Sequence, residues 1–172
     1  MQELHHEGDF SKYIKKRMEE KNSFSEKEIL RFLANIILVA FHMSSRDLYH
    51  RDLKPDNFLM KTDKNGLIYL HLSDFGTVKS SIIDEKRIKT AVGTGVGTIE
   101  YMAPEIHDAK TEMPVISKSD VWAIGVIAYQ ICNFTLPFEG SGTAAILKAI
   151  LFDAHKPIDH KGYSIELKDL ID

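Results

Sequence analysis

The sequence is poor in cysteine and has no long uninterrupted apolar segment. Cys132 is the only cysteine, which excludes an intramolecular disulfide and favours a reducing compartment, either cytoplasmic or nuclear. The most apolar stretch, residues 121–134, is too short to span a membrane and includes Gln130 and Asn133. No apolar run in the first ten residues resembles a secretory signal. We therefore expect an intracellular chain with no membrane partner.

An excess of positive charge is also lacking. The chain has 22 Lys and Arg residues against 25 Asp and Glu residues, which gives a net charge of −3, and no basic cluster dominates one segment. This balance disfavours nucleic acid as a partner. With 44% hydrophobic and 27% charged residues, the 172 residues have the composition of one globular domain with a real core.

Apolar spacing predicts helices in the first part of the chain. A helix is expected over residues 9–20, with Met18 on its apolar face and Lys15–Arg17 on a solvated face. Ser25 and Glu28 form a capping-box pattern, which predicts that a second helix begins here. Its apolar positions, expected to be largely buried, are Ile29, Phe32, Leu33, Ile36, Ile37, Ala40 and Met43.

The pattern changes after residue 47 and returns to helical spacing later. Strands are expected over 58–60 and 67–72, joined by a turn at Asn65-Gly66, and residues 76–100 read as a long loop. Later helices are expected over 118–133, which is apolar nearly all round, over 142–152 and from near Ser164; Trp122 and Cys132 are assigned to the core. The fold class is therefore mainly α with a small β element.

Three short segments carry residue types suited to phosphoryl transfer. They are His50-Arg51-Asp52-Leu53-Lys54-Pro55-Asp56-Asn57, Asp74-Phe75-Gly76 and Ala103-Pro104-Glu105. Their order and approximate spacing are those of the protein kinase signature. The chain resembles the eukaryotic protein kinase family, from its first residues to its last. Lys54 and Thr98 resemble the serine/threonine type of that family.

The resemblance implies a catalytic role for four residues and ATP and Mg²⁺ as cofactors. Asp52 would accept the proton of the substrate hydroxyl, and Lys54 would reach the transferred phosphate as a point charge. Thr98 would bond Asp52 and Lys54 through its hydroxyl. Asn57 and Asp74 would supply the oxygen ligands that a hard cation such as Mg²⁺ prefers.

The resemblance also implies nucleotide-binding and supporting residues. Glu3 and His5 would belong to the hinge that pairs with adenine, Asp9 would bond the ribose, and Leu59 would lie under the adenine ring. Asp120 would cap the backbone around the catalytic Asp52. The remaining structural or regulatory positions are His50, Arg51, Phe75, Gly76 and Glu105.

Two threonines in the long loop, Thr90 and Thr94, lie near the position of activating phosphates in the family. A phosphate there would pair with Arg51 and order the loop, which would add an upstream activating kinase to the partners. The alternative, equally favoured by the sequence, is a pair of solvated loop threonines.

The resemblance starts at the hinge, and no Gly-x-Gly-x-x-Gly motif occurs in the chain. We therefore expect residues 1–172 to be a partial protein kinase domain, comprising most of the C-terminal lobe without the N-terminal lobe. The arginine that pairs with Glu105 in the family is expected to be missing, so Glu105 is expected to be unpaired. The expected function is ATP-dependent phosphorylation of protein Ser or Thr hydroxyls; the alternative is a non-catalytic binding or regulatory module.

Overall fold

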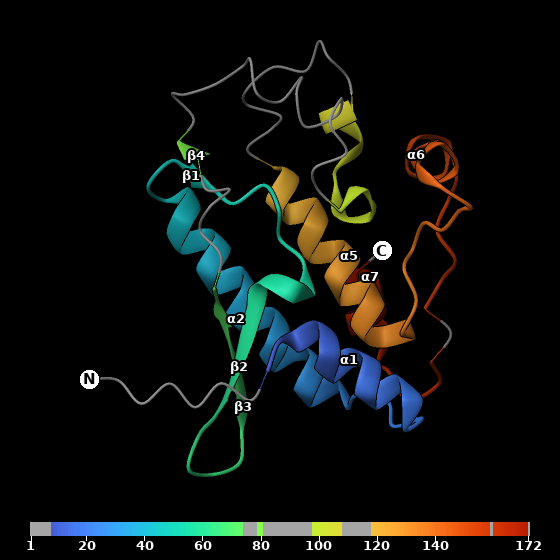
Figure 1. Ribbon diagram of the computed structural model, residues 1–172. Coiled ribbons are helices and arrows are strands. Elements are labelled where there is room, and N and C mark those ends of the chain that lie inside the picture. The colour runs from blue at the N-terminus through green and yellow to red at the C-terminus, as the bar shows by residue number, and fades with distance from the viewer. Residues whose placement is uncertain (1–7, 74–78, 81–97, 108–117, 159, 172) are drawn as a thin grey trace.

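The computed structural model describes residues 8–73, 79–80, 98–107, 118–158 and 160–171. Over these residues the chain is mainly helical with two small antiparallel sheets (Figure 1), which confirms the predicted fold class. The α-helices are α1 (Phe10–Glu19), α2 (Glu26–Ser44), α5 (Ser119–Asn133), α6 (Thr143–Phe152) and α7 (Ile165–Ile171). The strands are β1 (Leu48–Tyr49), β2 (Phe58–Thr62), β3 (Ile68–Leu72) and β4 (Lys79–Ser80). The 3-10 helices are η1 (Pro55–Asn57), η2 (Ile99–Tyr101) and η3 (Pro104–His107).

Helix α2 begins as its sequence predicts. The backbone N–H of Ser25 donates to Glu28 Oε2 at 2.8 Å, and the backbone N–H of Glu28 donates to Ser25 Oγ at 3.3 Å. This reciprocal pair satisfies two donors that would otherwise lack a partner at the start of the helix, and it confirms the predicted capping box.

The core lies where α1, α2 and α5 meet (Figure 1). Phe32 of α2 is fully buried, with ring centroids 5.0 Å from Phe10 and 5.7 Å from Phe24. Two predicted core positions are wrong: Met18 is 43% exposed and Ile37 is 47% exposed. The buried positions of α1 are Phe10 and Ile14, earlier in the helix than Met18, and Ile37 lines an open pocket between α2 and α5.

The prediction of a solvated basic face on α1 is wrong for Arg17. Its side chain is only 12% exposed and lies 4.4 Å above the ring of Phe24. Its guanidinium donates to Glu28 Oε1 at 3.0 Å and to the hydroxyl of Tyr13 at 2.9 Å. Arg17 therefore joins α1 to the first turn of α2, because its planar fork can stack on a ring and bond a carboxylate at once.

Strands β2 and β3 form the predicted hairpin, with Phe58 opposite Leu72 and Thr62 opposite Ile68. The turn between them includes Gly66, whose φ of 78° is a left-handed conformation that glycine adopts without strain. The hairpin is fixed to α2, since the backbone N–H of Leu70 donates to the side chain of Asn35 at 3.0 Å.

The pairing of β1 with β4 was not predicted from the sequence. Leu48 lies opposite Ser80 and Tyr49 opposite Lys79. A pair of two-residue strands has too few positions to produce a readable alternation of apolar and polar residues. Most of the predicted loop 76–100 lies outside the described residues.

Helix α5 crosses the molecule beside α2 (Figure 1). Nine of its residues are buried, including Cys132 as predicted, but Val121 is 67% exposed, so the helix is not covered on all sides. Trp122 is partly buried, and its ring stacks on that of Phe138 at a centroid distance of 5.7 Å. This contact joins α5 to the smaller apolar cluster that α6 completes with Ile150.

Candidate active site

The catalytic segment, defined here as residues 50–57, runs from β1 to β2 and brings its polar side chains together. Lys54 Nζ lies 3.0 Å from Asp52 Oδ2 and donates to Thr98 Oγ1, also at 3.0 Å. Thr98 comes from the distant turn that begins η2, 44 residues further along the chain. The side chains of Asp52 and Lys54 are each 19% exposed, so both groups are held by the protein yet can still be reached from solvent.

Asn57 is buried in η1 and oriented by Asp52. Its Nδ2 donates to the backbone oxygen of Asp52 at 2.7 Å and lies 3.3 Å from Oδ2 of the same residue. Because the amide nitrogen is committed to Asp52, the amide oxygen is the atom that Asn57 would offer to a cation. An amide oxygen suits a hard cation such as Mg²⁺, so the chemistry of this donor fits the expected ion.

Ser73 ties the end of the β2–β3 hairpin to the catalytic segment. Its backbone N–H and its hydroxyl donate to the backbone oxygen of Asn57 at 2.9 Å and 3.0 Å. Ser73 is the residue directly before Asp74, and Asp74 itself lies outside the described residues. Over the described ranges, no group of three or more His, Cys, Asp or Glu side chains is arranged to hold a metal ion.

Asp120, in the first turn of α5, holds the backbone before Asp52. Its Oδ2 accepts the backbone N–H of His50 and its Oδ1 accepts that of Arg51, both at 2.8 Å. Asp120 is 6% exposed and His50 is fully buried. These bonds matter because Arg51 has a φ of 64°, a left-handed conformation that costs a non-glycine residue roughly 1–3 kcal/mol and needs support from its surroundings.

The side chain of Arg51 lies near Asp120. Burial lowers the pKa of its guanidinium, and the charge of Asp120 partly offsets that effect. Its Nε and Nη2 atoms are buried and have no hydrogen-bond partner within the described part of the chain. A buried guanidinium with unmatched donors is suited to an anionic partner.

Two of the predicted nucleotide-binding residues lie side by side. Asp9 and Leu59 form an isolated antiparallel bridge, and the backbone N–H of Met60 donates to the oxygen of Gly8 at 3.1 Å. Asp9 is also the N-cap of α1, since its Oδ1 accepts the backbone N–H of Lys12 at 2.8 Å. Burial alone would raise the pKa of Asp9. The hydrogen bonds from Lys12 and its charge together outweigh that effect, so the pKa of Asp9 is lowered.

The expectation for Glu105 is wrong. Glu105 lies in η3, is partly exposed and is not without an interaction partner. The absence of one arginine does not leave this carboxylate unpaired, because sequence position cannot show which other side chains reach it. Seven predicted residues lie outside the described part of the chain: Glu3, His5, Asp74, Phe75, Gly76, Thr90 and Thr94.

A contact beside the site was not predicted from the sequence. The hydroxyl of Tyr101 in η2 donates to Gln130 Oε1 in α5 at 2.7 Å. Tyr101 is 8% exposed, and burial raises the pKa of its phenol, with a further contribution from the charge of Asp56. A buried tyrosine needs a polar partner, which was the available signal, but the sequence could not say which residue provides it.

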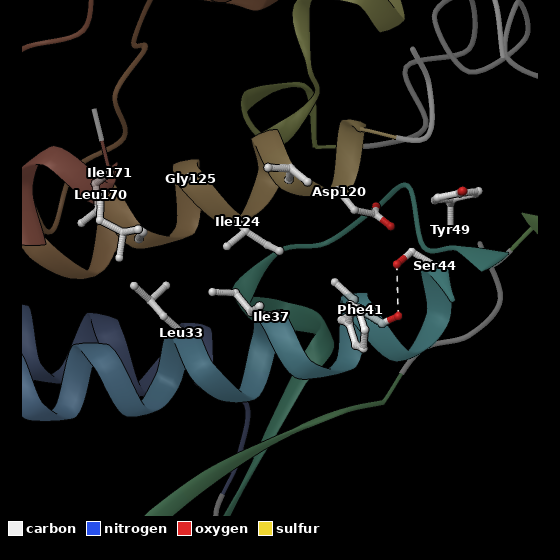
Figure 2. Close-up of a pocket in the computed structure, with 13 residues that line it drawn as sticks. Leu33, Ile37, Phe41, Ser44, Tyr49, Asp120, Ile124, Gly125, Leu170 and Ile171 are labelled. Atoms are coloured by element: carbon white, nitrogen blue, oxygen red, sulfur yellow. Dashed lines mark hydrogen bonds between the residues drawn. The ribbon is translucent and has the colours of Figure 1, made fainter. Parts of the chain in front are cut away.

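A pocket of about 420 Å³ lies between α2, α5 and α7 (Figure 2), and neither Asp52 nor Lys54 lines it. Its walls are mainly apolar, with Leu33 and Ile37 on α2 facing Ile124 on α5. Asp120 lies near one end and Leu170 at the other.

No helix in the described residues is long and apolar enough to cross a membrane.

The chain is similar to known protein kinases. It is 34% identical over 145 residues to the serine/threonine-protein kinase nekl-2 of Caenorhabditis elegans. The aligned region covers 84% of this chain and 38% of that protein. It is 32% identical over 164 residues to the serine/threonine-protein kinase Nek8 of Danio rerio, covering 95% of this chain and 22% of that protein. It is 33% identical over 135 residues to the human ribosomal protein S6 kinase alpha-3, covering 78% of this chain and 17% of that protein.

The chain thus spans well under half the length of these relatives. Residues 1–172, the whole chain, match the sequence profile of the protein kinase domain. Together with the catalytic segment and its contacts to Thr98 and Asp120, this match identifies the family. The chain belongs to the protein kinase family and resembles its serine/threonine members.

Proposed function

We propose that this chain carries the catalytic residues of a serine/threonine protein kinase, which transfers the γ-phosphate of ATP to a Ser or Thr hydroxyl of a protein substrate. The observation that carries the proposal is the position of Lys54 Nζ, 3.0 Å from both Asp52 Oδ2 and Thr98 Oγ1. It places a carboxylate, an ammonium group and a hydroxyl at one partly exposed point.

These groups divide the work of phosphoryl transfer. The carboxylate of Asp52 orients the substrate hydroxyl and accepts its proton as the oxygen attacks the γ-phosphorus. The ammonium group of Lys54 offsets the negative charge of the phosphoryl group during transfer, and the leaving ADP takes the electron pair of the broken P–O bond. Thr98 keeps Lys54 pointed into the site through its hydroxyl.

The cofactor ligands are proposed from the family resemblance. Asn57 and Asp74 would hold Mg²⁺, which when bound neutralises and orients the phosphates. Asp9 and Leu59, which lie side by side, would contact the ribose and the adenine, with Glu3 and His5 pairing with the adenine edge. All six assignments rest on the family resemblance, and the bridge adds support for Asp9 and Leu59 only.

Other proposals concern partners and location. The unmatched donors of Arg51 support phosphate recognition, which fits modification of Thr90 or Thr94 by an upstream kinase. The single cysteine supports the cytoplasm or the nucleus as the compartment. Residues 1–172 would form one part of a longer kinase domain.

The test is phosphate transfer by the full-length protein and two variants. Wild-type protein should transfer labelled phosphate from Mg-ATP to Ser and Thr peptides in preference to a matched Tyr peptide. Asp52→Asn should lower turnover by roughly two to four orders of magnitude, because the proton acceptor is lost, with similar ATP affinity. Asp169→Asn changes an exposed carboxylate of α7 and should behave as wild type.

Two results would contradict this function. Turnover by Asp52→Asn close to that of wild type would remove Asp52 from the role of proton acceptor. No transfer by folded wild-type protein, with Thr90 and Thr94 phosphorylated or not, would favour the non-catalytic binding module instead.

A further inference from the structure

Helix α5 contacts the candidate active site at two points ten residues apart in the helix. Near its start, Asp120 accepts the backbone N–H groups of His50 and Arg51. Near its end, Gln130 Oε1 accepts the hydroxyl of Tyr101 at 2.7 Å. The 3-10 helix η2 (Ile99–Tyr101), which follows Thr98, packs against α5 (Figure 1).

The second contact leads to the catalytic pair through the 98–101 turn. The backbone N–H of Tyr101 donates to the backbone oxygen of Thr98 at 3.0 Å, which closes the turn. The hydroxyl of Thr98 accepts Lys54 Nζ at 3.0 Å, and Lys54 in turn meets Asp52. A continuous series of contacts therefore runs from Gln130 to Asp52.

We propose that Gln130 is a positioning residue for the phosphoryl-transfer site, acting through Tyr101 and Thr98 to hold Lys54 against Asp52; this rests on the proposed function. Gln130 touches neither member of the catalytic pair. Its effect is to fix the turn from which Thr98 reaches Lys54.

The chemistry of the contact favours this role. Burial keeps the phenol of Tyr101 protonated, so the Tyr101 oxygen is a donor and the Gln130 oxygen its acceptor. Tyr101 has little access to water, so loss of the acceptor would leave a buried hydroxyl without a partner. The turn can relieve that cost by shifting toward solvent, and such a shift would move Thr98 away from Lys54.

The activity test compares Gln130→Met, which keeps the approximate shape and loses the acceptor, with Gln130→Glu, which keeps an acceptor oxygen. Turnover of full-length Gln130→Met should fall by about three- to tenfold, the effect of one hydrogen bond, with the KM for ATP unchanged. Gln130→Glu should restore turnover to within about twofold of wild type. Tyr101→Phe, which loses the donor, should lower turnover as much as Gln130→Met does. It replaces Gln130→Met in the test if that variant does not fold.

A double-mutant cycle with Thr98→Val separates positioning from general destabilisation. If Gln130 acts through Thr98, Gln130→Met should have little further effect on turnover once the Thr98 hydroxyl is gone. Independent losses that multiply would overturn the proposal, as would unchanged turnover in both Gln130→Met and Tyr101→Phe.

Hydrogen exchange gives a readout that does not depend on activity. In Gln130→Met, the backbone N–H of Tyr101 should exchange faster than in wild type, whereas those of His50 and Arg51, held by Asp120, should not change. Equal acceleration at both places, or at neither, would overturn the positioning role. If wild type transfers no phosphate while this local exchange pattern holds, the proposed function fails and the link from Gln130 to the turn stands.

Discussion

The carboxylate of Asp120 accepts the backbone N–H of His50 at 2.8 Å although 70 residues separate the two in the sequence. Both residues are buried, and the second oxygen of the same carboxylate accepts the next backbone N–H, that of Arg51. One side chain of α5 thereby fixes two consecutive peptide groups directly before Asp52.

The first prediction concerns this carboxylate. Asp120→Ala should lower the free energy of unfolding by about 2–4 kcal/mol, because two backbone donors lose their acceptor at a site with little access to water. Asp120→Asn keeps one acceptor oxygen and should cost less. Urea denaturation of the purified proteins measures both values, with the exposed Asp169→Ala of α7 as a control. Equal stability of Asp120→Ala and the control would mean that other groups satisfy these donors.

The second prediction concerns the core of α2. Phe32→Ala should lower the free energy of unfolding by about 3–5 kcal/mol, because Phe32 is fully buried and its loss leaves a cavity against Phe10 and Phe24. Leu38→Ala on the same helix is the matched control: its side chain is 63% exposed, so the change should stay within about 0.5 kcal/mol. Thermal and urea unfolding give the comparison, and similar losses for both variants would contradict the described orientation of α2.

The third prediction concerns pH. Burial alone would raise the pKa of Glu28, but hydrogen bonds from Ser25 and the guanidinium of Arg17 lower it below its ordinary value of 4.5. A carboxylate with a lowered pKa in the folded state stabilises the protein above its unfolded pKa, and that stabilisation is lost as the pH falls through the folded pKa. Stability should therefore decrease below about pH 4.5 partly through Glu28.

The measurement is the free energy of unfolding in urea at several pH values between neutrality and pH 3. Glu28→Gln should be less stable than wild type at neutral pH, and the difference should shrink as the pH falls. The exposed Glu166→Gln of α7 removes the same charge as a control. A difference between Glu28→Gln and wild type that stays constant with pH would rule out this linkage.

The fourth prediction uses the single cysteine. Cys132 is 3% exposed, and burial raises the pKa of its thiol to about 12. The thiolate is the reactive form, so the folded protein should react with a thiol reagent at pH 8 far more slowly than the protein in denaturant. Labelling followed by absorbance measures both rates. Native labelling as fast as labelling in denaturant would place Cys132 outside the core.

The sequence alone determined the features that depend on local spacing. The string His50–Asn57, with Asp74–Gly76 and Ala103–Glu105, indicated the family, because the order and approximate spacing of the three segments are those of the protein kinase signature. The capping pair Ser25 and Glu28 marked the start of α2, since both partners lie within one helical turn. The Asn65-Gly66 step located the hairpin turn, because backbone conformation there limits the residues that fit.

Only the tertiary structure decided which distant groups meet. The contacts of Asp120 with His50, of Lys54 with Thr98 and of Tyr101 with Gln130 each join segments far apart in the chain. Periodicity reports which face of an element is apolar, and it contains no information on the neighbour of each polar atom. The sequence pattern likewise predicts a solvated Arg17, but its guanidinium packs on Phe24 and pairs with Glu28. The packing of α1 against α2 brings these partners to Arg17, and periodicity within α1 cannot report it.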